Sequence, residues 1–184
     1  PGAGNNCTSG GTGNTGTNGV ITNTPEADCI ITTGDIDNLG FGWPAGFDVF
    51  SGKSTPVHGY PWDIDPSDPP GTDRILLGTS NTGRVQDGYS RTSRPDNLPK
   101  AISTSFDCPY TINSAILQMF VDDFQAPVFG SHFQVEMNGV RAPFLESVIN
   151  ALSQTGPIGK LISVQVPSDY LSLLSGGELS IYID

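Results

Sequence analysis

Three acidic turns carry the side chains of this sequence that are best suited to chemistry. The first turn, TTGDIDNLG, places two aspartates and an asparagine after a glycine, and the second, PWDIDPSDPPGTD, holds four aspartates. The third is a pair of aspartates that follows an apolar run in FVDDFQAP. Ca²⁺ binds six to eight oxygen atoms from carboxylates, amide side chains and loop carbonyls. The turns therefore predict a calcium site, and its candidate ligands are Asp35, Asp37, Asn38, Asp122 and Asp123.

A plainer interpretation of the same turns is that their acids only shape and solvate the loops. Asp and Asn side chains commonly bond to nearby backbone groups in turns. None of the three segments has the stricter spacing of an EF-hand loop. The sequence leaves both interpretations open.

Catalytic chemistry has much less support. His58 and His132 are the only imidazoles, and the sequence contains no nucleophile elbow, HExxH motif or phosphate-binding loop. Paired carboxylates of the glycosidase type are easy to find by chance in an acidic chain. We therefore expect no enzyme, and we expect each histidine to be a surface or loop-packing residue.

Aromatic residues indicate a different kind of site, a binding surface for sugars. Aromatic rings stack on the apolar faces of sugars, while polar side chains hydrogen-bond the hydroxyl groups. The candidate binding residues are Trp43, Tyr60, Trp62, Tyr89 and Arg91. For the two tryptophans we favour the alternative that they fill the space beneath their own loop.

Composition places these residues on an acidic, turn-rich chain. The 184 residues fit one domain, and eight basic residues against nineteen acidic ones give a formal charge of −11. That sign argues against a nucleic-acid partner. The 23 glycines and 15 prolines fit a loop-rich β protein. No apolar run approaches the roughly 18 residues of a membrane span.

The cysteines indicate secretion. Cys7, Cys29 and Cys108 occur in a chain rich in Gly, Thr and Asn, and an odd count fits one disulfide and one leftover thiol. Cys7–Cys29 is our first choice for the disulfide, Cys29–Cys108 is nearly as good, and three unpaired cysteines are the third possibility. No CxxC pair or Cys/His cluster favours zinc. We interpret the start at Pro1 as a mature or excised form, and we expect an extracellular or cell-surface location.

Short alternating strands are expected to position these groups. Apolar and polar residues alternate, or apolar runs occur, over 29–33, 74–78, 101–106, 115–121, 132–137, 140–142, 161–166 and 179–183. Asn138-Gly139 predicts a tight hairpin, and short helices are expected over 144–153 and 169–174. The pattern predicts an all-β fold, namely an antiparallel β-sandwich or jelly roll with long loops and one or two short helices. Residues 38–73 predict a packed aromatic loop.

The order of Asp-rich loop, aromatic loop and alternating strands resembles the galactose-binding-like jelly rolls of extracellular carbohydrate-binding and adhesion proteins. The resemblance covers about residues 28–184. It implies one structural calcium near the first strand, to which Asp35 and Asp37 correspond, and a ligand site in the loops at one end. Such folds usually close with a further apolar strand, whereas this sequence ends at 179–184 in strand pattern.

An N-terminal extension, residues 1–25, precedes the expected sandwich domain, residues 26–184. The extension has no charged residue, and ordering such a segment requires a partner because it loses conformational entropy. Its one β-prone run, Gly19–Thr24, could fill an open sheet edge on a neighbouring copy.

Two functions follow as hypotheses. The first is a structural subunit of an extracellular filament or surface assembly, stabilised by calcium and joined by strand exchange through the extension. The alternative is a carbohydrate-binding or adhesion module of a secreted protein, in which the extension folds back on its own domain.

Overall fold

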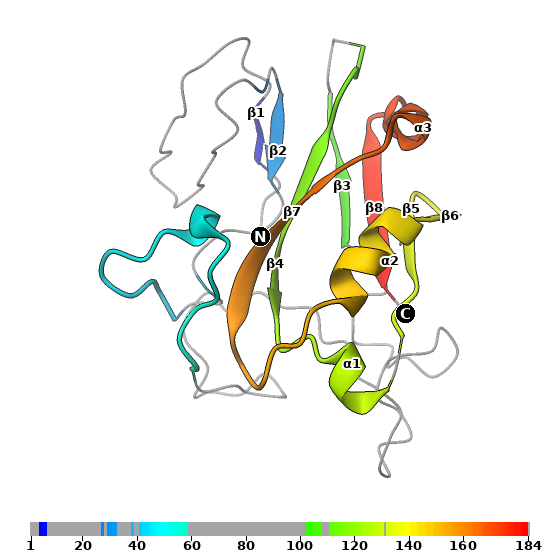
Figure 1. Ribbon diagram of the computed structural model, residues 1–184. Helices are drawn as coiled ribbons and strands as arrows, with labels where there is room; N and C mark the ends of the chain where they lie inside the picture. The colour runs from blue at the N-terminus through cyan, green and yellow to red at the C-terminus, as the bar shows by residue number, and fades with distance from the viewer. Residues whose placement is uncertain are drawn as a thin grey trace, which may run out of the picture.

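The strands of this protein form where apolar and polar residues alternate. A computed structural model shows these strands arranged as an antiparallel β-sandwich (Figure 1). The structure describes residues 4–6, 27, 29–32, 38, 41–58, 102–107, 111–130 and 132–183. The strands are β1 (Gly4–Asn6), β2 (Ile30–Thr32), β3 (Ile102–Ser105), β4 (Ile116–Asp122), β5 (Val135–Met137), β6 (Val140–Arg141), β7 (Gly159–Gln165) and β8 (Glu178–Ile183). The helices are η1 (Val49–Ser51), α1 (Ala126–Phe129), α2 (Pro143–Asn150), α3 (Ser168–Leu171) and η2 (Ser172–Leu174).

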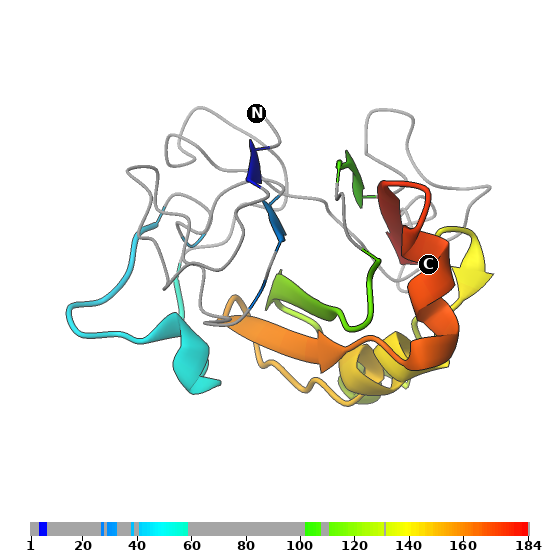
Figure 2. The ribbon, with the colours of Figure 1, turned by 90° about the horizontal axis from the view of Figure 1, so that it is seen from above.

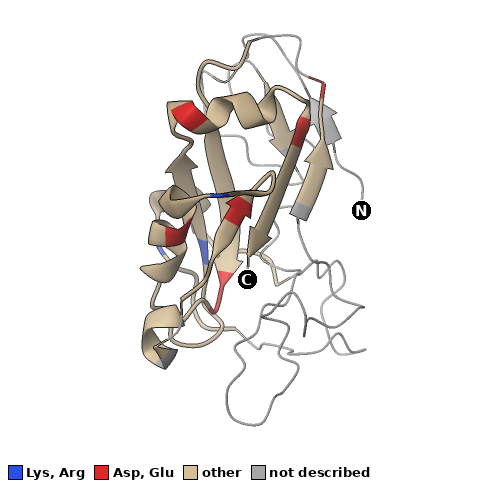
Figure 3. Cartoon of the chain, turned by 90° about the vertical axis from the view of Figure 1, so that its right-hand side faces the viewer, with Lys and Arg blue, Asp and Glu red and all other residues tan. Residues whose placement is uncertain are grey.

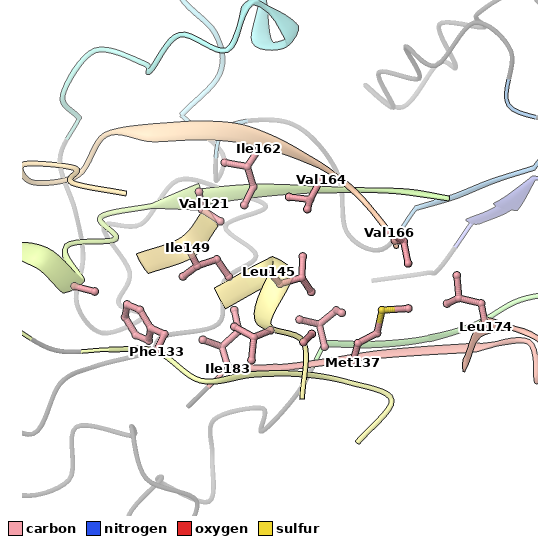
Figure 4. Close-up of a cluster of buried hydrophobic side chains, with 14 residues drawn as sticks. Val121, Phe133, Met137, Leu145, Ile149, Ile162, Val164, Val166, Leu174 and Ile183 are labelled. Atoms are coloured by element: carbon pink, nitrogen blue, oxygen red, sulfur yellow. The ribbon is translucent and has the colours of Figure 1, made fainter. Parts of the chain in front are cut away.

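Two antiparallel layers enclose the core. One layer is the four-stranded sheet β3-β8-β5-β6, and the other is the pair β4-β7. Figure 4 shows the buried cluster between them, with α2 contributing Leu145 and Ile149, both fully buried. The expected all-β sandwich with long loops and short helices is therefore confirmed.

The strand patterns explain which face is buried. On β5 and just before it, Phe133, Val135 and Met137 are buried on one face, as their alternation predicts. Asn138 and Gly139 both have positive φ angles, 49° and 76°, which is the backbone of the tight hairpin turn that Asn-Gly predicts. The hairpin β5–β6 is therefore confirmed as well.

The last strand differs from expectation. We expected the sheet to lack a closing strand after 179–183, and β8 itself lies inside its sheet, paired with β3 on one side and with β5 on the other. The reason is that the hairpin β5–β6 and the strand β3, both distant in sequence, bracket β8. The expected strand over 74–78 lies outside the described residues.

An ion pair, Arg141–Glu146, lies beside the core at α2. Glu146 is buried, accepts the backbone N–H of Val135 at 3.2 Å, and meets the Arg141 guanidinium through Nε–Oε1 and Nη2–Oε2 contacts of 2.8 and 3.1 Å. The Arg141 hydrogen bonds lower the pKa of Glu146 below its ordinary value, against the opposing effect of burial. The carboxylate form is thus the one that the fold stabilises.

This pair predicts a loss of stability in acid. Because the pKa of Glu146 is lower in the folded chain, its contribution is complete above the ordinary value of 4.5 and is lost as pH falls through the folded value. Glu146→Gln should cost about 1–2 kcal/mol near neutral pH, and the difference from wild type should shrink below about pH 4.5. Urea unfolding at a series of pH values measures this. Glu178→Gln, at an exposed glutamate of β8, is the matched control, and parallel pH curves for wild type and Glu146→Gln would contradict the prediction.

Candidate functional site

The predicted loop over 38–73 is described continuously only over 41–58; this segment, hereafter the aromatic loop, lies along the start of β7 (Figures 1 and 2). Three hydrogen bonds attach its second half. The Thr55 N–H donates to the Gly159 carbonyl at 2.8 Å, the Gly159 N–H donates to Thr55 Oγ1 at 2.8 Å, and the His58 N–H donates to the Pro157 carbonyl at 3.1 Å. The loop therefore extends the β4–β7 layer through main-chain contacts at β7.

Aromatic packing attaches the first half of the aromatic loop. The Trp43 ring stands edge-on to Phe120 of β4, with centroids 5.5 Å apart, and stacks on Phe47 at 5.4 Å. The Phe120 ring in turn occupies the space that a side chain at Gly159 would need. Trp43 is half-buried, and these two ring contacts pack it against its own loop and against β4; its space-filling role stays a prediction.

The contacts of the aromatic loop place His58 beside Asp122, the last residue of β4. His58 Nε2 lies 2.8 Å from Asp122 Oδ2, and the two side chains are only 10% and 6% exposed. The imidazole also stacks on Phe41, with centroids 4.4 Å apart. Burial raises the pKa of Asp122, and the hydrogen bond to His58 opposes that rise. A buried acid and a histidine 64 residues away are thus joined at one end of the sandwich.

Asp123 has a separate role in the corner after β4. Its φ of 56° lies in the left-handed region, and its carboxylate accepts hydrogen bonds from the Gln125 side chain and from the Gly156 backbone. Burial is the main cause that raises the pKa of Asp123. Buried Gln154 completes this corner, because its Oε1 accepts the Phe124 N–H at 2.7 Å.

Two buried oxygen atoms of the candidate calcium ligands lack hydrogen-bond donors in the described part of the chain. They are Oδ1 of Asn38 and Oδ1 of Asp122. The Asn38 amide nitrogen is satisfied, because Nδ2 donates to the Gly42 carbonyl at 2.8 Å, and the Phe41 N–H donates to the Asn38 carbonyl. Buried polar atoms are nearly always paired, so an orphaned oxygen requires an explanation. Amide and carboxylate oxygens without donors are the atoms that Ca²⁺ prefers.

The structure covers only part of the predicted sites. Of the candidate calcium ligands, Asn38, Asp122 and Asp123 are described. Among the described residues, no group of three His, Cys, Asp or Glu side chains could hold a metal ion. Other predicted site residues lie outside the described part of the chain, namely Asp35, Asp37, Tyr60, Trp62, Tyr89, Arg91 and Cys7, and with Cys7 the first-choice disulfide. The His58–Asp122 pair was not foreseen, because nothing in the sequence links positions so far apart.

Comparison with known proteins gives no relative from which a function could be transferred. No protein-family model matches the chain, and no curated protein or solved structure matches it at a significant level. Within the described residues, no helix is long and apolar enough to cross a membrane. Function must therefore be inferred from the geometry of the chain itself.

Proposed function

We propose that this chain is a calcium-stabilised subunit of an extracellular filament or surface assembly, in which β1 of one copy pairs with β2 of the next. The starting observation is that the N-terminal extension pairs with β2 of its own chain, and the proposal is that a neighbouring copy takes over this pairing. Gly4, Asn5 and Asn6 lie opposite Thr32, Ile31 and Ile30 in an antiparallel ladder. This ladder is a two-stranded sheet, and it brings the charge-free extension into contact with the sandwich domain.

The ladder suits exchange between copies for two reasons. It is only three residue pairs long, and an isolated two-stranded ladder is marginally stable in water. Its hydrogen bonds join main-chain groups, so the same ladder forms equally well with the β2 of an identical neighbour. Residues 7–29, which separate the two strands, provide ample length to reach a second copy.

Exchange of this kind is favoured at high protein concentration. Within one chain, β1 meets β2 at an effective concentration of the order of millimolar. Pairing with a neighbouring copy therefore competes only when the protein concentration approaches that value. When the exchange does not close into a dimer, each copy donates one strand and accepts another, and the product is an open filament. The run Gly19–Thr24, which we expected to be the donor, lies outside the described residues, so Gly4–Asn6 takes that role in the proposal.

In the proposal, bound calcium reduces the negative charge that would otherwise keep the copies apart. The chain carries a formal charge of −11, and copies with such a charge repel one another. Figure 3 shows acidic residues on several elements, whereas the basic residues of the described part are Lys53, Arg141 and Lys160. In the proposal, the orphaned oxygens of Asn38 and Asp122 serve as calcium ligands, joined by Asp35 and Asp37, which precede Asn38 in the sequence. The bound cation would then lower both the local and the total negative charge.

Proline substitutions in β1 test the proposed contact. Proline lacks the backbone N–H and is poorly tolerated in a ladder, so Asn5→Pro/Asn6→Pro should abolish assembly while circular dichroism stays that of a folded β protein. Asn5→Ala/Asn6→Ala is the matched control, because it changes the same side chains but keeps both backbone donors. Sedimentation velocity over a range of concentrations, with calcium present, measures the outcome.

Two results would overturn the proposal. The first is a proline variant that assembles as well as the alanine control. The second is a wild-type chain that stays monomeric at every concentration with calcium present. In the second case, the carbohydrate-binding or adhesion module becomes the better hypothesis, and retention on glycan columns is the next measurement.

A further inference from the structure

The side chain of Asn138, in the turn between β5 and β6, makes three hydrogen bonds to other parts of the fold. Its Nδ2 donates to the carbonyls of Leu173 and Glu178 at 2.6 and 2.8 Å, and its Oδ1 accepts the N–H of Ser180 at 2.6 Å. Its backbone N–H also donates to the Ser180 carbonyl at 2.8 Å. Asn138 therefore links the hairpin to η2 and to β8.

The residue after Asn138 makes this side chain chemically vulnerable. In an Asn-Gly sequence the glycine nitrogen is unhindered and can attack the side-chain carbonyl carbon of the asparagine. A bond forms between Gly139 N and Asn138 Cγ, the side-chain nitrogen leaves as ammonia, and a cyclic imide results. Water then opens the imide at either carbonyl and gives aspartate or isoaspartate. The balance is one water consumed and one ammonia released, with no other reactant.

The native geometry opposes this reaction. Attack on Cγ requires the side-chain amide to turn towards Gly139, which breaks the three hydrogen bonds to Leu173, Glu178 and Ser180. The backbone would also have to leave the turn conformation, in which Asn138 and Gly139 have φ angles of 49° and 76°. The amide can thus react only when the hairpin separates from β8.

The product would not fit the native site. An aspartate at 138 replaces the donating NH₂ with an oxygen, which then faces the carbonyl oxygens of Leu173 and Glu178. Two acceptors lose their donor and meet a negative charge instead. Isoaspartate additionally inserts a methylene group into the backbone of a two-residue turn. Either product therefore weakens the attachment that had protected the asparagine.

We propose that Asn138 is a deamidation site controlled by the fold, protected while the β5–β6 turn is bonded to β8 and reactive when that contact opens. The reaction converts a reversible opening of the sheet into permanent damage. This inference is independent of the proposed assembly, since it depends only on contacts within one sandwich domain.

Deamidation rates in the native and unfolded chain test the inference. The full chain is incubated at mildly alkaline pH, with and without a denaturing concentration of urea, and digested peptides are followed by mass spectrometry. We expect Asn138 to react at least about tenfold faster in urea, because an opening free energy of about 1.4 kcal/mol already reduces the open fraction tenfold. Asn18-Gly19, the same dipeptide elsewhere in the sequence, is the internal reference for the rate in urea. Equal rates at Asn138 in native and unfolded protein would overturn the inference.

A pair of variants tests the predicted damage. Asn138→Asp should lower the melting temperature more than Asn138→Gly, because glycine loses the side-chain hydrogen bonds but accepts the positive φ and adds no carboxylate that repels the Leu173 and Glu178 carbonyls. An Asn138→Asp variant as stable as wild type would show that the product fits the site after all.

Discussion

The proposed calcium site predicts that EDTA lowers the melting temperature of this protein by roughly 5–10 °C and that added Ca²⁺ restores it. A ligand at one hundred times its Kd stabilises the native state by about 2.7 kcal/mol. For a domain of this length, each kcal/mol corresponds to roughly 2–4 °C. The structural reason is the pair of buried oxygens, Asn38 Oδ1 and Asp122 Oδ1, that have no donor in the described part of the chain. Calorimetry in EDTA, and again after excess Ca²⁺, measures the effect.

Matched variants locate the calcium response. Asp122→Asn removes the charge of a candidate ligand and should reduce the calcium-dependent shift, whereas Asp169→Asn removes an exposed charge on α3 and should leave it intact. Magnesium is a further control, because it prefers a rigid octahedral shell and keeps its waters. A melting curve that EDTA leaves unchanged would remove calcium from the proposal.

Substitution of Gly159 by alanine is expected to destabilise the fold by about 1–3 kcal/mol. The added Cβ would overlap the ring of Phe120, which packs at right angles to Trp43 of the aromatic loop. The ring must move, and its movement loosens the packing of the aromatic loop beside the His58–Asp122 pair. Urea unfolding measures the free energy of unfolding of the variant.

Gly176 provides a control in the same chain. A Cβ at Gly176 meets no atom within 4 Å, so Gly176→Ala should change stability by less than about 0.5 kcal/mol. Adding Phe120→Leu to Gly159→Ala should recover part of the loss, because it removes the obstructing ring. Equal costs for the two glycine substitutions would contradict the packing that we describe.

The strands were predictable because their signals are local. The alternation at 161–166 and the Asn-Gly turn at 138–139 depend on neighbouring residues alone, and the structure has strand and hairpin at these positions. The short helix α1 was not foreseen, because its four residues, Ala126–Phe129, are too few to show helical periodicity. The place of β8 was also missed, since pairing order depends on contacts between distant segments.

The candidate site shows the same division. Asn38 and Asp122 were named as candidate calcium ligands from residue type and turn context, and that role stays a prediction; within the described residues each has a buried oxygen without a donor. The attachment of His58 to Asp122 could not be inferred, because Thr55, Gly159 and Pro157 together determine where the histidine lies. The extension pairs through Gly4–Asn6, a run without β-branched side chains whose strand character has no local signal.

Disulfide cross-linking between two differently substituted copies tests strand exchange most directly. Asn5 lies opposite Ile31 in the β1–β2 register, and cysteines at opposed positions of antiparallel strands come within disulfide range. One preparation carries Asn5→Cys and a second carries Ile31→Cys, so a bond between positions 5 and 31 in their mixture must join two chains. The double variant Asn5→Cys/Ile31→Cys is the positive control, and peptide mass spectrometry separates this bond from any made by the native cysteines. Strand exchange predicts the 5–31 bond in the oxidised mixture at concentrations where the protein assembles. A bond that forms in the double variant but never in the mixture would show that β1 stays on its own domain, and would contradict the proposed assembly.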